Sequence, residues 1–124
     1  MKSAVAMSRG TIVLDENLLA LKEYFLKRNI KVIVPRQGLS DTSIMNELLS
    51  HRIFVTANSK DFINEVSSFE FGLISADNVQ KVPADALVKM ISDALIEYSL
   101  WAKRHGFVLV LKQSGKHQYK DLTE

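Results

Sequence analysis

The sequence predicts an α/β domain, a three-layer sandwich in which helices cover both faces of a mainly parallel, five-stranded sheet. Two observations lead to this class. Short β-branched and apolar segments alternate along the chain with longer segments in which apolar residues recur at helical spacing. The short segments are also almost continuously apolar, as expected of parallel strands that are buried on both faces. Strands that alternate with helices form a parallel sheet with helices packed on it.

The expected elements follow one another in a regular order. Strands are expected at 11–14, 31–34, 53–56, 71–75 and 107–111. Each of the first four strands is followed by an expected helix. The first helix runs to about residue 28, and the second begins at Ser40 and Asp41. The third begins at Asn58 and Ser59, and the fourth covers 83–105. Asp, Asn and Ser favour helix N-termini, whereas Pro83 and Gly106 stand where a helix begins and ends.

The last of these helices is apolar around most of its circumference. A helix with this pattern is usually buried on more than one side. We expect most of the stripe to lie in the core and the remainder to contact a partner, such as a second copy of the chain in a homodimer. The apolar residues are Leu87, Val88, Met90, Ile91, Ala94, Leu95, Ile96, Tyr98, Leu100, Trp101 and Ala102.

The 124 residues suit one domain, expected at 11–111 between a loosely ordered leader at 1–10 and a polar tail at 112–124. The leader lacks the apolar core of a signal peptide, and no apolar run approaches the roughly 18 residues of a membrane helix. The sequence therefore predicts a cytoplasmic protein without membrane contact. The absence of cysteine excludes disulfides, thiolate catalysis and cysteine-bound zinc. A net charge of +2 neither indicates nor excludes a nucleic-acid partner.

Several polar residues follow the expected strands. Asp15 follows the first strand, Asp41 lies in the loop after the second, and Thr56, Asn58 and Asp61 end or follow the third. In an open parallel sheet, ligands bind outside the carboxyl ends of the strands, so all five residues are expected at one edge. Aspartate oxygens are suitable ligands for Mg²⁺ or Mn²⁺, which activate water and neutralise charge on a phosphate.

A simpler interpretation is that these residues only cap helices. Asp15, Asp41 and Asn58 each occupy a position where an N-cap is common, and Asn58 to Asp61 has the spacing of a capping box. Any sheet of this type places such caps at one edge. Position alone therefore leaves both interpretations open.

Three segments resemble motifs of the short PIN-like nuclease family, which includes VapC-type toxins. Ile12-Val-Leu-Asp-Glu-Asn17 resembles its opening strand, a hydrophobic run that ends in Asp-x-Asn. Gly38-Leu-Ser-Asp41-x-x-Ile44 is similar to its Gly-Leu…Asp…Ile signature. Phe54-Val-Thr-Ala-Asn-Ser-Lys-Asp-Phe62 resembles its Thr-x-Asn-x-x-Asp-Phe segment. The motifs occur in the same order and cover a little over half of the chain, 11–76.

The resemblance implies a parallel sheet, an acidic pocket for Mg²⁺ or Mn²⁺ and cleavage of RNA, with an antitoxin as a further partner. It assigns catalytic and metal-binding roles to Asp15, Asp41 and Asp61, and polar substrate-binding positions to Thr56 and Asn58. The chain departs from the family in one respect. Where many relatives have an acid after the threonine, it has Asn58 and Ser59.

Basic residues near the same edge are further candidates. Arg36 follows the second strand and Lys60 lies between Asn58 and Asp61, so both are expected to contact a phosphate backbone or to be solvated surface charges. The histidines, at 51, 105 and 117, are far apart in sequence. His51 and His105 stand near helix C-termini, where a histidine is favourable to the helix dipole.

The sequence thus supports a metal-dependent, ribonuclease-like domain, with the toxin half of a toxin–antitoxin pair as one expected role. The neutral Asn58 favours the alternative of a PIN-like binding module without catalysis. A third alternative is an unrelated small-molecule-binding domain whose aspartates lie too far apart to share an ion.

Overall fold

The computed structural model describes residues 10–123 as an α/β domain built on one six-stranded sheet, with strand order β2-β1-β3-β4-β5-β6. The expected leader lies outside the described residues except for Gly10, which begins β1. Strands β1 to β5 are parallel, and β6 is antiparallel to β5. The strands are Gly10–Leu14 (β1), Ile30–Ile33 (β2), Ile53–Thr56 (β3), Gly72–Ser75 (β4), Phe107–Val110 (β5) and Gln118–Asp121 (β6).

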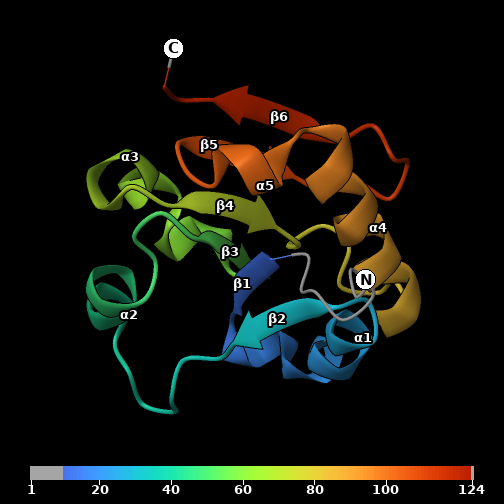
Figure 1. Cartoon of the computed structure of the whole chain (residues 1–124), viewed down its shortest axis with the longest axis horizontal. Coiled ribbons are helices and arrows are strands. Elements are labelled where there is room, and N and C mark those ends of the chain that lie inside the picture. Colours follow the sequence, from blue (N-terminus) through green and yellow to red (C-terminus); the bar gives the residue numbers. More distant parts are fainter. Residues whose placement is uncertain (1–9, 124) are drawn as a thin grey trace, which may run out of the picture.

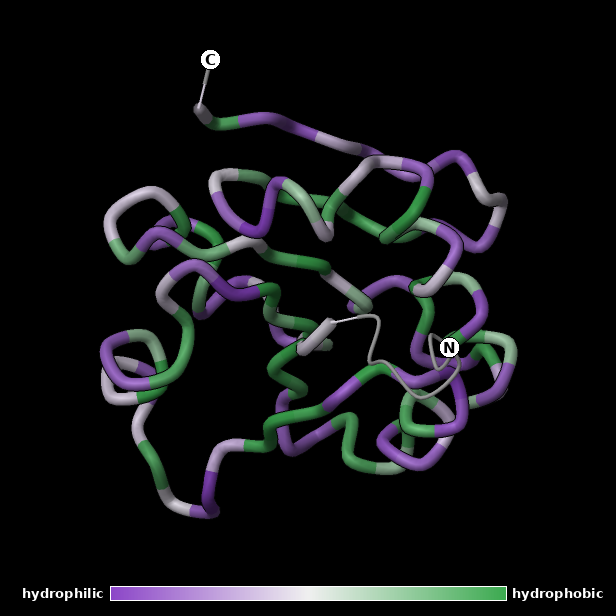
Figure 2. The backbone as a smooth tube through the Cα atoms, viewed as in Figure 1, coloured by the Kyte–Doolittle hydropathy of each residue, from purple (hydrophilic) through white to green (hydrophobic). Residues whose placement is uncertain are grey.

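Successive strand residues point to opposite faces and so form two separate cores. On β1, Ile12 and Leu14 belong to one core and Val13 to the other. The first core also contains Phe25 and the buried face of the long C-terminal helix, and the second contains Phe54. Figure 2 shows the hydrophobic central strands between more polar outer segments. The expected three-layer arrangement is therefore present.

Helices on the first core connect β1 to β2 and β4 to β5. They comprise the 3₁₀ helix η2 (Glu16–Leu21), α1 (Lys22–Leu26), α4 (Ala84–Glu97) and α5 (Leu100–Lys103). Helices on the second core connect β2 to β3 and β3 to β4. They comprise α2 (Asp41–Glu47), the 3₁₀ helices η3 (Ser59–Asp61) and η4 (Ile63–Glu65), and α3 (Val66–Phe69). Figure 1 shows α1 and α4 on one side of the sheet and α2 and α3 on the other.

The expected helix over 83–105 is interrupted. Ser99 adopts a left-handed conformation with φ of 54°, which separates α4 from α5. At this break Tyr98 stacks on Tyr119 of β6, with ring centroids 5.0 Å apart. The apolar stripe is mostly buried, as expected, but Ile96 is 59% exposed. The helical pattern in the sequence did not reveal the break because both halves continue the same buried face.

The sixth strand is a correction to the expected tail at 112–124. Although polar, Gln118–Asp121 pairs with β5 and completes the sheet. Lys103 of α5 forms a 2.8 Å ion pair with Asp121 and donates a 3.0 Å hydrogen bond to Thr123. The Lys103 ammonium and the hydrogen bonds from Thr123 lower the pKa of Asp121 to about 2. The stabilisation from Asp121 is therefore present above its ordinary pKa of 3.8 and is lost as the pH falls toward about 2.

The strand order also fixes where a ligand site is expected. In the sheet, β2 lies on one side of β1 and β3 lies on the other. The connections that leave β1 and β3 therefore run in opposite directions across the sheet, and a crevice is expected between the ends of these two strands. In doubly wound sheets of order 2-1-3-4-5, ligands bind at the carboxyl ends of the strands beside this point. Within residues 10–123, none of the helices is both long and apolar enough to span a bilayer.

Gly72, at the start of β4, provides a test of the packing between β4 and β5. A Cβ atom at this position would overlap the ring of Phe107 and lie 2.9 Å from the carbonyl oxygen of Arg104. We expect Gly72→Ala to lower the free energy of unfolding by about 1–3 kcal/mol, measured by urea denaturation, because the well-packed core cannot accept the added methyl group.

Phe107→Leu serves as the control because it removes part of the ring that the methyl group would meet. The double variant should then lose less stability than the two single variants together. Full additivity of the two losses would contradict this account of the packing.

Candidate functional site

Asp15 and Thr56 meet at the carboxyl edge of the sheet. Leu14 pairs with Val55 in the parallel register, which places the next residues of β1 and β3 side by side. The Asp15 backbone N–H donates to the Val55 carbonyl oxygen at 3.0 Å, and the Thr56 hydroxyl donates to the Asp15 carboxylate at 2.6 Å. Thr56 is fully buried and Asp15 is partly buried. The threonine therefore holds the carboxylate in one orientation.

The same threonine also fixes the loop that follows β3. Its hydroxyl oxygen accepts a 3.0 Å hydrogen bond from the Asn58 backbone N–H. The Asn58 side-chain amide in turn donates to the Asp61 carboxylate. Asp15, Thr56, Asn58 and Asp61 thus form one continuous hydrogen-bonded network that joins the end of β1 to the loop after β3.

Asp41 approaches this network from the loop between β2 and α2. It lies in the first turn of α2 and is exposed. Partial burial raises the pKa of Asp41, and the nearby negative charges of Asp61 and Asp15 raise it further. Asp41 is therefore near enough to Asp61 and Asp15 for their charges to act on it, although the three come from separate segments.

The caps-only interpretation is wrong for Asp15 and Asn58. Each precedes a 3₁₀ helix, but neither side chain makes a capping hydrogen bond. The cap of α2 is Ser40, whose hydroxyl oxygen accepts from the Ser43 backbone N–H at 3.1 Å, and not Asp41. Asp61 accepts from the Asn58 side chain instead of completing a capping box. Asp15 is engaged across the edge with Thr56, and Asn58 is engaged with Asp61 in its own loop.

The aspartates are nevertheless not arranged as a tight cage. Among residues 10–123, three His, Asp or Glu donor atoms lie within 4.8 Å of one another at His51, Glu70 and His105, which are at the opposite edge. Asp15, Asp41 and Asp61 do not form such a close group. Neutral Asn58 occupies one hydrogen-bonding position of Asp61.

A fourth acid, Asp77, was not singled out from the sequence. It lies just beyond β4, and its carboxylate accepts from the Ser59 hydroxyl at 2.7 Å and the Ser59 backbone N–H at 3.1 Å. The buried Ser75 hydroxyl donates to Ser59 at 3.2 Å. Asp77 thus holds the loop that carries Asn58 and Asp61. Its position two residues after a strand is the signal that could have indicated it.

The two basic candidates remain exposed near the edge. Arg36 lies in the loop between β2 and α2, and Lys60 lies in η3 beside Asp61. Next to the network is a cavity of about 320 Å³. Its lining includes Asn17, Leu18, Ala57, Gln80 and Val82. The site therefore combines carboxylates, exposed cations and a hollow with both polar and apolar walls.

Comparisons of the chain with protein-family models, with curated proteins and with solved structures give no match.

The double role of the Thr56 hydroxyl can be tested by Thr56→Val, which keeps the side-chain shape. The variant leaves the Asn58 N–H and the Asp15 carboxylate without their shared partner. We expect the free energy of unfolding to fall by about 1–3 kcal/mol in urea denaturation. The control is Thr42→Val, which changes an exposed threonine in α2. An equal loss of unfolding free energy in both variants would contradict the double role of the Thr56 hydroxyl.

The pKa of Asp41, which is raised by partial burial and by the charges of Asp61 and Asp15, predicts a pH dependence of stability. Because the folded state raises the pKa of Asp41 above 3.8, folding favours its protonated form, and stability from this group falls as the pH rises through both values. Without added metal, Asp41→Asn should therefore gain stability relative to the native chain between about pH 3 and about pH 7. Urea denaturation at each pH measures the difference.

Asp85→Asn is the matched control, since Asp85 also lies in the first turn of a helix. Removing either acid weakens the interaction with the helix dipole. If Asp41→Asn is less stable than the native chain at neutral pH, by about as much as Asp85→Asn, then the repulsion at the edge is negligible.

Proposed function

We propose that this chain is a PIN-like, ribonuclease-like domain that depends on Mg²⁺ or Mn²⁺ and acts on RNA in the cytoplasm. The observation that carries the proposal is the convergence of Asp15, Asp41 and Asp61. They come from three separate segments and share one edge of the sheet. The charges of Asp61 and Asp15 contribute to the raised pKa of Asp41. Helix caps would share this edge too, but Asp15 makes no capping hydrogen bond and Ser40, not Asp41, caps α2. Carboxylates that repel one another are stabilised by a bound cation.

The donor set suits a hard divalent cation. Mg²⁺ and Mn²⁺ prefer oxygen ligands and commonly retain several waters, so a few carboxylates with space between them are sufficient. Asp15, Asp41 and Asp61 would hold the ion. The bound ion would supply an activated water and stabilise the negative charge that develops on a phosphodiester.

The remaining residues of the edge have supporting roles. Thr56 orients Asp15 through the 2.6 Å hydrogen bond, and Asn58 orients Asp61. Arg36 and Lys60 are exposed on the same side, where cations contact phosphate oxygens. The cavity beside Asn17 and Ala57 has apolar wall residues, among them Leu18 and Val82, that suit the face of a base. Together these features favour a single-stranded RNA substrate.

A PIN-like binding module without catalysis is the second candidate. The hydrogen bond from Asn58 to Asp61 favours it, because the amide supplies a fixed donor where a carboxylate would add a metal ligand. In this case the edge would bind its partner through the same polar residues without cleaving it.

The partners proposed for the 83–105 region are an antitoxin or a second copy of the chain. Since most of the apolar stripe is buried in the core, a contact there is restricted to exposed positions such as Ile96. The exposed part of the apolar stripe is therefore smaller than the sequence pattern suggested.

Asp15→Asn should abolish Mn²⁺-dependent cleavage of a labelled single-stranded RNA. We expect the cleavage rate to fall by more than the roughly 10- to 100-fold that is typical when a residue that merely orients a metal ligand is replaced, because a ligand itself is lost. Its circular dichroism should match that of the native chain. Asp93→Asn, which alters an exposed acid paired with Lys89 on α4, should cleave normally.

Asn58→Asp provides the complementary variant. If the domain is a nuclease, an added carboxylate should tighten Mn²⁺ binding in calorimetry and leave cleavage intact or faster. A native chain that binds no Mn²⁺ at millimolar concentration and cleaves no RNA would refute the nuclease. RNA binding without cleavage would then support the binding module.

A further inference from the structure

A second cluster of metal-binding side chains lies at the opposite edge of the sheet. His51, Glu70 and His105 precede β3, β4 and β5, respectively, and each stands two residues before its strand begins. The first residues of these strands, Ile53, Gly72 and Phe107, are partners in the parallel register. Because the offsets are equal and the register is shared, three residues distant in sequence lie side by side at the amino edge.

The side chains of this cluster, called here the His51 cluster, converge on one point. One donor atom from each residue lies within 4.8 Å of the others. His51 Nε2 is 3.7 Å from Glu70 Oε2, and the rings of His51 and His105 have centroids 4.5 Å apart. Ligands of a tetrahedral zinc ion, bound at about 2.0–2.2 Å, lie roughly 3.4 Å from one another. Small side-chain movements would thus complete such a site.

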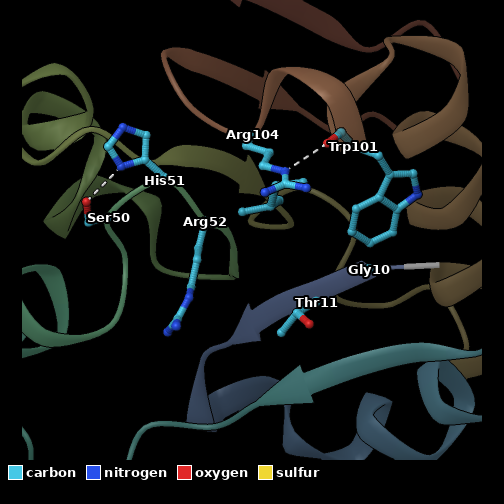
Figure 3. Close-up of a pocket in the computed structure, with 8 residues that line it drawn as sticks. Gly10, Thr11, Ser50, His51, Arg52, Trp101 and Arg104 are labelled. Atoms are coloured by element: carbon cyan, nitrogen blue, oxygen red, sulfur yellow. Dashed lines mark hydrogen bonds between the residues drawn. The ribbon is translucent and has the colours of Figure 1, made fainter. Parts of the chain in front are cut away.

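The orientation of His51 also suits a ligand. The Ser50 hydroxyl is 3.0 Å from His51 Nδ1 (Figure 3). The other ring nitrogen, Nε2, lies 3.7 Å from Glu70 Oε2. A hydrogen bond at the second ring nitrogen is the usual arrangement for a metal-binding histidine, because it fixes the ring and its tautomer. The ring lies at the side of a cavity of about 370 Å³, where Trp101 forms the other side (Figure 3).

The backbone around the cluster is unusual. His51 and Glu70 both have a φ of 56°, and Arg104, next to His105, has a φ of 65°. Glycine or asparagine adopts this left-handed conformation at lower cost. Non-glycine residues held in it tend to cluster at ligand sites.

We propose that His51, Glu70 and His105 bind one Zn²⁺ ion or a similar transition-metal ion. Two imidazoles and one carboxylate form a known zinc donor set, with a fourth position for water or a ligand. Imidazole selects Zn²⁺ over Mg²⁺, so this site and the aspartates at the other edge prefer different metals. The proposal does not depend on the proposed nuclease function.

Titration calorimetry with tag-free protein and Zn²⁺ tests the proposal, and the absorption spectrum of Co²⁺-loaded protein reports tetrahedral coordination. We expect one Zn²⁺ per chain. His51→Asn, in which asparagine tolerates the left-handed backbone, and His105→Gln should each weaken binding at least tenfold. Glu70→Gln should also weaken it. Roughly tenfold excess Mg²⁺ should not displace the zinc.

The third histidine provides the matched control. His117 lies in the turn before β6, where its Nδ1 accepts from the Lys112 backbone N–H, and His117→Gln should bind zinc like the native chain. Asp15→Asn should do so too, which separates this site from the carboxyl edge. Absence of stoichiometric binding, or full binding by both His51→Asn and His105→Gln, would overturn the proposal. So would an equal loss in His117→Gln.

Discussion

Ile53 of β3, Gly72 of β4 and Phe107 of β5 lie side by side in parallel register, and β1 joins the same ladder through Ile12 and Ile53. This register is the constraint on which the rest of the structure depends. At the carboxyl ends of the strands it places Asp15 beside Thr56. At the amino ends it aligns the three residues of the His51 cluster. A shift of one residue between neighbouring strands would reverse the inward and outward faces and separate both groups.

The two edges differ in the chemistry that they offer. The carboxyl edge contains carboxylates, a buried hydroxyl and exposed cations, which suit a hard ion and a phosphate group. The amino edge contains two imidazoles and a carboxylate, which suit a softer ion such as Zn²⁺. The sheet and its two cores separate these groups. A parallel sheet can therefore support two independent sites with different metal preferences.

Thr56 connects packing with chemistry at the carboxyl edge. Its side chain is fully buried, so its hydroxyl has no access to water and must find partners within the protein. It donates to Asp15 and accepts from Asn58, and this fixes both residues. Asp77 provides similar support through Ser59. The buried Thr56 and the partly buried Asp77 thus position residues that meet solvent.

The sequence by itself determined the strands β1 to β5, the two-sided burial of the sheet and the presence of Asp15, Asp41 and Asp61 at one edge, because these follow from local apolar patterns and from the direction of parallel strands. Only the tertiary structure decided what depends on contacts between distant segments. The polar β6 is held by β5 and Lys103, and the break at Ser99 is not visible in the apolar pattern. Asp15 does not cap a helix because its side chain engages Thr56 of another strand, whereas the side chain of Asn58 engages Asp61 in its own loop. His51 and His105 meet although 53 residues separate them, since the register of three strands brings them together.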